Sequence, residues 1–216
     1  MSKNLIHYYN QRAEEYDKVY TIPEEKNDLA RSVRIFQDLF AAKTVIEVAC
    51  GTGYWTKHIS VTALSVYASD VSERMVSLAK EKVKATNVRL EVANMYDLPE
   101  TKKYDAFFGG FIWSHIMLEE INMFLKKVLE LIKPNGVFAF IDSKPKDKTT
   151  HDKKRISHTD ESGNTFQTRH LEDGSTHLVL KNFPTKEFLF GKLKPFGVEV
   201  EYIDLDHYWI VFGELK

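Results

Sequence analysis

The stretch EVACGTG, residues 47–53, decides the fold of this chain. It overlaps the short apolar run TVIEVA and is followed by YWTKHIS, whose pattern predicts a helix. A buried strand, a loop with two glycines and a helix together form the start of a nucleotide-binding βαβ unit. Such a loop binds either the pyrophosphate of a dinucleotide or the adenosine of a cofactor that has no phosphate.

Strands and helices alternate on both sides of this loop. Helices are expected at residues 5–20 and 23–40, before the first strand at 44–49. Further strands are expected at 64–70, 88–93, 104–110 and 137–142, with intervening helices at 54–60, 72–85 and 118–132. Pro134 ends the last of these helices, and Gly136 suits a left-handed turn. The alternation predicts right-handed crossovers and a parallel sheet.

The alternation stops after residue 142. Residues 143–155 are polar and basic, and a hairpin is expected near residues 164–182, where Asp173 and Gly174 as central turn residues would place His170 opposite His177. A helix follows with Pro184 in its first turn, and two final strands pair antiparallel. The prediction is an α/β, Rossmann-like, mostly parallel seven-stranded sheet with helices on both faces, an antiparallel last strand pair and an inserted hairpin.

Composition excludes several classes of protein. A net charge of −1 disfavours nucleic acid as the main partner, because binding to a phosphate backbone needs a basic excess. No apolar stretch approaches the roughly 18 residues that span a bilayer. The N-terminal residues become charged too early for a secretory signal, and Cys50 is the single cysteine. We therefore expect one cytoplasmic domain over residues 1–216.

The glycine loop lacks the third glycine of a dinucleotide site. Tyr54 and Trp55 are bulky where the start of a helix would approach a pyrophosphate, and Thr56 stands where the third glycine belongs. Glu47 would repel a diphosphate but suits the ammonium of an amino-acid-like ligand. These features favour S-adenosylmethionine over NAD, and an NAD-dependent oxidoreductase is the less favoured alternative.

At this point the sequence resembles the class I S-adenosylmethionine-dependent methyltransferases over nearly its whole length. The acid and the two glycines of the first motif match Glu47, Gly51 and Gly53. The acid that closes the second strand is Asp70 in YASDVS. The third motif matches Asn94 and Met95 in VANMYDLP, with Asn94 in place of the common aspartate. YDAFFGG and LIKPNGVFAF resemble the fourth strand and the helix–turn–strand after it.

The resemblance implies a role for each matched residue. Glu47 would act on the amino-acid end of the cofactor, Asp70 would bind the ribose hydroxyls, and Asn94 with Met95 would frame the adenine. The loop glycines would let the backbone approach. The N-terminal YYNQRAEEYD resembles the aromatic cap of small-molecule enzymes in this class, although its tyrosines could also simply pack on the sheet. The implied cofactor site comprises Tyr8, Tyr16, Glu47, Gly51, Thr52, Gly53, Asp70, Val71, Met75, Asn94, Met95 and Gly110.

The residues that would act on the acceptor are less defined. His115 could serve as a general base, or it could be a histidine bonded to a nearby backbone group. Phe111 and Trp113 could form an acceptor wall or pack under the next helix. Cys50 lies inside the cofactor loop and is not expected to be a nucleophile. We expect no metal, because the histidines of the hairpin lack further ligands at suitable spacing.

The acceptor is predicted to be a small molecule. Enzymes that methylate amino groups of DNA bases or glutamine carry an acid or asparagine and two prolines after the fourth strand, where this chain has GGFI. Residues 1–40 are expected to form a helical cap, and residues 143–183 an inserted loop and hairpin over the acceptor. The lysines of residues 144–155 could be a solvated face or an anion-attracting rim. A non-catalytic cofactor-binding protein and a macromolecular substrate delivered by a partner remain alternatives, and the oligomeric state is open.

Overall fold

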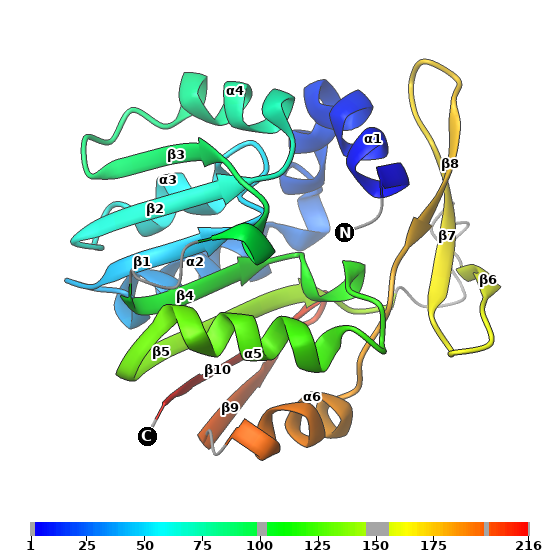
Figure 1. Cartoon of the computed structure of the whole chain (residues 1–216). Coiled ribbons are helices and arrows are strands. Elements are labelled where there is room, and N and C mark those ends of the chain that lie inside the picture. Colours follow the sequence, from blue (N-terminus) through cyan, green and yellow to red (C-terminus); the bar gives the residue numbers. More distant parts are fainter. Residues whose placement is uncertain (1–2, 99–102, 146–155, 197–198, 216) are drawn as a thin grey trace.

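The structure of the chain, a computed structural model, describes residues 3–98, 103–145, 156–196 and 199–215 (Figure 1). The predicted basic segment therefore lies mostly outside the described residues, since 146–155 are among those left out.

The main sheet has seven strands, as predicted. They are β1 (Thr44–Val48), β2 (Ser65–Asp70), β3 (Val88–Val92), β4 (Tyr104–Gly110), β5 (Ile132–Ser143), β9 (Glu199–Asp204) and β10 (Tyr208–Glu214). Their spatial order is β3-β2-β1-β4-β5-β10-β9. The first five run parallel, while β10 pairs antiparallel with both β5 and β9. Strand order reverses between β1 and β4, which is the place where ligands bind in open α/β sheets.

Helices cover both faces of this sheet. On one face pack α2 (Lys26–Leu39) and α3 (Tyr54–Ile59), and on the other α5 (Ile121–Leu131) and α6 (Lys186–Leu193). The helix α4 (Glu73–Lys82) packs on β2 and β3, and α1 (Lys3–Arg12) lies against α4. The two aromatic residues in the middle of β4 show how both faces become core, since neighbouring residues of a strand point to opposite sides. Phe107 packs in the core beneath α5 and α6, and Phe108 packs against Phe36 of α2 and Trp55 of α3.

Short 3-10 helices connect these elements. They are η1 (Ala13–Tyr20), η2 (Pro23–Glu25), η3 (Met95–Asp97), η4 (Trp113–His115) and η5 (Lys194–Phe196). The helix predicted at residues 5–20 is thus α-helical only to Arg12 and continues as η1. Ser72 caps α4 as its N-cap, because its hydroxyl accepts a hydrogen bond from Met75 N at 3.1 Å.

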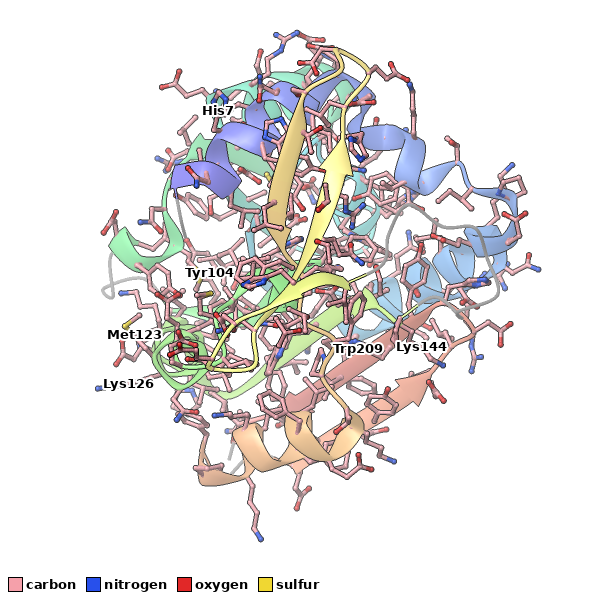
Figure 2. All side chains as sticks on the ribbon, turned by 90° about the vertical axis from the view of Figure 1, so that its right-hand side faces the viewer. His7, Tyr104, Met123, Lys126, Lys144 and Trp209 are labelled. Atoms are coloured by element: carbon pink, nitrogen blue, oxygen red, sulfur yellow. The ribbon has the colours of Figure 1, made fainter. Side chains whose placement is uncertain are left out.

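A separate antiparallel sheet contains the predicted hairpin and one strand that was not predicted. It consists of β6 (Ile156–Thr159), β7 (Thr165–His170) and β8 (Thr176–Leu180). In Figure 1 this sheet and α1 stand beside the edge toward which the arrowheads of the parallel strands point. Figure 2 looks onto that edge, with β7 and β8 in front of the main sheet. The inserted hairpin therefore lies beside the carboxyl ends of the parallel strands.

The register of the hairpin differs from the prediction by one residue. His170 pairs with Thr176, and His177 pairs with Arg169. The reason is the turn: Gly174 N donates to Leu171 O at 3.0 Å, and Gly174 has a φ of +85°. These are features of a three-residue loop with a left-handed glycine rather than a two-residue turn.

Two further turn residues differ from expectation. In KPNG the positive φ belongs to Asn135, at +61°, and the segment is continuous with β5. Gly136 is required by space instead, because a Cβ there would lie 2.1 Å from Ile132 Cγ2. Pro184 precedes the N-cap of α6, which is Thr185, and so stands just outside the first turn.

We predict that Gly136→Ala lowers the free energy of unfolding by roughly 1–3 kcal/mol, because the new methyl group overpacks the start of β5. Gly191→Ala is the matched control, since Gly191 is an exposed residue of α6 with nothing within 4 Å of the added Cβ. That variant should gain roughly 0.5–1 kcal/mol from helix propensity. Urea unfolding of both variants measures the difference, and equal stability of the two would contradict the steric argument.

Candidate functional site

A cavity runs along the carboxyl edge of the parallel strands. Its empty volume is about 820 Å³, and its wall combines the loop after β1, the ends of β2 and β4, the loop after β3 and the N-terminal cap. Of the twelve residues predicted to bind the cofactor, eight line this cavity: Tyr16, Gly51, Asp70, Val71, Met75, Asn94, Met95 and Gly110. The topology thus brings to one place residues that lie up to 94 positions apart in the chain, from Tyr16 to Gly110.

Asp70 fixes the centre of the cavity wall. Its Oδ2 accepts a hydrogen bond from Gly51 N at 2.9 Å, and its Oδ1 accepts one from Ser72 N at 2.8 Å. Burial raises the pKa of the Asp70 carboxyl, and the hydrogen bonds from backbone N–H groups oppose this shift. Each oxygen keeps a second lone pair for a ligand hydroxyl. The carboxylate can therefore hold the glycine loop and a ribose at the same time.

The glycine loop approaches the cavity through its backbone. Gly51 has a φ of +55°, and Ala49, which also lines the cavity, has a φ of +53°. A left-handed φ is uncommon for a residue with a Cβ and is concentrated at functional sites. Without a side chain, Gly51 leaves the loop open toward the cavity beside Asp70.

Two predicted loop residues face elsewhere. Thr52 Oγ1 donates to Asp17 Oδ1, and the other oxygen of Asp17 pairs with Lys82 Nζ at 2.6 Å. This contact ties η1 to the loop. Gly53 packs against α4, where a Cβ would lie 2.7 Å from Val83 Cγ2, and its N–H donates to Cys50 O. Neither residue lines the cavity, so their roles are to shape and anchor the loop.

Glu47 lies behind the cavity wall and is fully buried. Its Oε2 has no hydrogen-bond partner among the described residues. Burial raises the pKa of the Glu47 carboxyl to about 8, and the negative charge of Asp70 adds to the shift. An unpartnered buried carboxyl oxygen is costly, and a nearby cation would relieve the cost. This orphaned atom fits a ligand with an ammonium group.

The expected adenine region is formed by the loop after β3. Asn94 caps η3, because its Oδ1 accepts from Tyr96 N at 3.3 Å. Met95 is buried, and both residues line the cavity together with Tyr96. Tyr96 was not predicted, since aromatic residues after the third strand gave no separate signal in the sequence.

The N-terminal cap uses a different tyrosine than predicted. Tyr9 and Tyr16 line the cavity, while Tyr8 packs with Leu171 and Val179 of the hairpin region. Successive residues of an α-helix point about 100° apart, so adjacent tyrosines of α1 cannot both face the cavity. Tyr8 packs against the hairpin region instead, and the position of the hairpin relative to α1 could not be predicted from the sequence.

A second, larger cavity adjoins the first. Its empty volume is about 1770 Å³, and it opens between α1, η2, the hairpin and the turn between β9 and β10. Four residues line both cavities: Tyr9, Tyr16, Phe111 and His115. They form what we call the shared wall. A ligand group in one cavity would meet a ligand group in the other at this wall.

His115 of the shared wall is a neutral, fully bonded histidine. Its Nδ1 lies 2.6 Å from Leu180 O, and its Nε2 lies 2.8 Å from Tyr9 Oη. Because a carbonyl can only accept, Nδ1 carries the proton and Nε2 accepts from the tyrosine hydroxyl. Burial lowers the pKa of His115 to about 3, and the positive charge of Lys181 adds to the shift. The alternative in which His115 bonds a backbone group is the one observed.

The neighbouring aromatics separate into two roles. Phe111 lines both cavities and has a φ of +57°, whereas Trp113 is 1% exposed and packs in the core against Phe124 and Phe140. Cys50 is a buried free cysteine whose pKa burial raises well above its ordinary value, so it stays a thiol.

The described residues hold no group of three or more His, Cys, Asp or Glu side chains that could bind a metal ion. Within the same part of the chain, no helix is long and apolar enough to cross a membrane.

Comparison with known proteins identifies the central part of the chain. Residues 45–136 match the family described as methyltransferase domain. An uncharacterised methyltransferase of Schizosaccharomyces pombe is 30% identical over 105 residues, 43% of this chain and 36% of that protein. Malonyl-[acyl-carrier protein] O-methyltransferase of Priestia megaterium is 29% identical over 100 residues, 44% of this chain and 35% of that protein. Demethylmenaquinone methyltransferase of Staphylococcus aureus is 27% identical over 150 residues, which are 66% of this chain and 61% of that protein. The chain spans 35–61% of the length of these relatives.

Solved structures share the fold over the whole chain. DhpI in complex with SAH has a TM-score of 0.79 at 24% identity, covering 99% of this chain and 98% of that one. The CcbJ methyltransferase of Streptomyces caelestis has a TM-score of 0.71 at 18% identity, covering 100% and 99%. The predicted fold is therefore confirmed, including the antiparallel last strand pair.

We predict that His115 makes the stability of the protein fall in acid. The unfolded histidine gains a proton below pH 6.5, whereas the folded one stays neutral down to about pH 3, so stability is full above 6.5 and is lost between these values. At pH 5 the loss amounts to about 2 kcal/mol relative to pH 7.5. His115→Gln should remove this part of the pH dependence, and His170→Gln, at an exposed hairpin position, should leave it unchanged. Urea unfolding at both pH values tests this, and equal pH dependence of wild type and His115→Gln would contradict it.

Proposed function

We propose that this chain is a class I S-adenosylmethionine-dependent methyltransferase that transfers the methyl group of that cofactor to a small acceptor molecule. The observation that carries the proposal is the placement of Asp70 beside Gly51 in a cavity at the switch point of the sheet. A carboxylate in that position suits a ribose, and the loop has Thr56 in place of the third glycine of a pyrophosphate-binding loop.

The residues present fit this cofactor. Asp70 would accept from the ribose hydroxyls, the loop after β3 would hold the adenine, and Glu47 with its unpartnered oxygen would attract the ammonium, directly or through a water. Tyr16 would cover the methionine end. When bound, S-adenosylmethionine supplies a methyl group already activated for displacement by a nucleophile.

The main contribution of the protein itself would be to position the acceptor against the methyl group and to exclude water from the place where they meet. The shared wall of Tyr9, Tyr16, Phe111 and His115 surrounds the junction where acceptor and methyl group would meet. Aligning two reactants there is worth several orders of magnitude in rate. His115 orients the Tyr9 hydroxyl rather than removing a proton, since its pKa lies at about 3 and its Nε2 is already bonded.

The start of α3 argues against the alternative of an NAD-dependent oxidoreductase. Tyr54, in the first turn of α3, stacks on Tyr20 of η1 with ring centroids 3.8 Å apart. The stack places a bulky side chain at the first residue of the helix whose N-terminus binds pyrophosphate in a dinucleotide fold. Thr56, at the position of the third glycine, is fully buried between α3 and the sheet. The geometry favours a cofactor without phosphate.

A small acceptor is proposed because the second cavity is bounded by the cap, the hairpin and the end of the main sheet. The relatives include a demethylmenaquinone methyltransferase and a malonyl-[acyl-carrier protein] O-methyltransferase, so the acceptors named for them are diverse. We further propose a single domain with the hairpin as the acceptor cover. Two expectations stay predictions from composition: that the protein has no nucleic-acid partner, and that it is cytoplasmic.

We predict that Asp70→Asn weakens binding of S-adenosylhomocysteine by about 10–100-fold, because the charge-assisted hydrogen bonds to the ribose are lost. Asparagine keeps one oxygen for the backbone N–H of Gly51, while the hydrogen bond from Ser72 N to the second oxygen is lost, so thermal unfolding should accompany the titration as a check that the loop persists. Asp97→Asn is the control, since Asp97 is exposed at the end of η3. Calorimetric titration measures the affinities, and NAD should give no heat. Binding of NAD, or no binding of S-adenosylhomocysteine to wild type, would overturn the proposal.

We predict that cofactor binding releases a proton from Glu47. With its pKa at about 8, Glu47 is neutral at pH 7 and must ionise to pair with the ammonium. Affinity for S-adenosylhomocysteine should therefore rise by up to about tenfold per pH unit between pH 6 and 8 and level off above. Glu47→Gln should bind more weakly at pH 8 and show no such rise. Calorimetry in buffers of different ionisation enthalpy counts the protons, and a count of zero for wild type at pH 7 would contradict the pairing.

A further inference from the structure

The second cavity carries positive charge that the cofactor site does not use. Its cationic lining residues are Arg12, Lys144, Arg169 and Lys181. Two of the four are neutralised by neighbouring carboxylates. Lys181 Nζ lies 2.8 Å from Asp142 Oδ1, and Lys144 Nζ lies 2.8 Å from Asp204 Oδ1. These lysines hold the walls of the cavity together and are not available to a ligand.

The two arginines have no such partner. Within the described residues, neither Arg12 nor Arg169 forms an ion pair with a carboxylate. Arg12 lies over the ring of Tyr16, with 5.1 Å from Cζ to the centroid. Arg169 Nη2 donates to Gln167 Oε1, while its buried Nε has no partner. A half-buried guanidinium with unused donors is costly unless a ligand supplies the acceptor.

Both arginines lie at the end of the cavity that meets the cofactor site. Burial and Tyr16 raise the pKa of Tyr9 well above its usual value, and the charges of Arg12 and Arg169 act on the same hydroxyl in the opposite direction. Arg12 also lies over the ring of Tyr16, which belongs to the shared wall, so its guanidinium lies beside the junction.

The acidic lining residues belong to other elements of the cavity. Glu24 and Glu25 lie in η2, and Asp206 lies in the turn between β9 and β10. The Glu25 carboxylate accepts a hydrogen bond from Tyr208, which also comes from that region. The cavity therefore holds charges of both signs, with the two arginines on α1 and β7 and the carboxylates on η2 and the turn between β9 and β10. The Glu25–Tyr208 pair also borders the shared wall, because Tyr208 packs against Phe111.

We propose that Arg12 and Arg169 bind an oxyanion of the methyl acceptor, a carboxylate or a phosphoryl group, and thereby hold the acceptor at the shared wall. This inference rests on the proposed function, because it assigns the second cavity to the acceptor. The planar guanidinium presents paired N–H donors that match the oxygens of either group. The substrate class is thus a small organic acid whose charged group lies close to the methyl donor.

The test is calorimetry on the full chain saturated with S-adenosylhomocysteine. The probes are phenylphosphonate, benzoate and uncharged benzamide, which share an aromatic ring and differ in charge. The variants are Arg169→Gln and Arg12→Gln, with Arg31→Gln on the exposed side of α2 as the matched control. We expect wild type and Arg31→Gln to bind at least one anion about tenfold or more tightly than benzamide. Each cavity variant should lose that preference.

The outcomes separate this inference from the proposed function. Unchanged affinity of Arg169→Gln for S-adenosylhomocysteine shows that the cofactor site is intact, so a loss of anion binding then supports the arginine site. A preference for phenylphosphonate or for benzoate supports it equally and identifies the group. Anion binding no tighter than benzamide binding, or retained in Arg169→Gln, overturns it. Failure of wild type to bind S-adenosylhomocysteine removes the proposed function, and the inference with it.

Discussion

The carboxylate of Asp70 is the constraint on which the rest of the site depends. It ends β2 and accepts the backbone N–H groups of Gly51 and Ser72, so one side chain joins the glycine loop to the start of α4. Because β1 and β2 are parallel and adjacent, their carboxyl ends place these groups together without further support. The first cavity exists because this junction keeps the loop against the sheet while leaving room in front of it.

Around this junction the structure tolerates features that a core would exclude. Ala49 and Phe111 take left-handed backbone conformations, and Glu47 keeps an unpartnered oxygen in a fully buried position. Each is unfavourable alone, and together they lie on or behind the wall of the two cavities. Such a concentration is typical of a site prepared for a ligand, whose binding offsets the cost. The well-packed core on both faces of the sheet supplies the stability that allows it.

The second cavity depends on contacts between segments far apart in the chain. Asp142 at the end of β5 accepts from Ser114 N and pairs with Lys181 beyond β8, which fixes the hairpin to the main sheet. His115 continues this connection, since it bonds Leu180 O on one side and Tyr9 on the other. The cap and the insertion thereby enclose the second cavity beside the first, and we propose this second cavity as the acceptor site.

Periodicity and turn residues in the sequence predicted the alternating strands and helices, the parallel sheet and the glycine loop, because these follow from local pattern and from the topology that the pattern implies. The resemblance to the methyltransferase family added Asp70, Val71, Met75, Asn94 and Met95, all of which line the first cavity. The tertiary structure alone decided between Tyr8 and Tyr9, the one-residue register of the hairpin, and the pairing of Lys181 with Asp142. It also decided that Arg12 and Arg169 share one cavity. The hairpin register follows from its three-residue turn. The choice between Tyr8 and Tyr9 and the meeting of the two arginines depend on how the insertion packs on the N-terminal cap, more than a hundred residues away in the sequence, and no local pattern encodes such a contact.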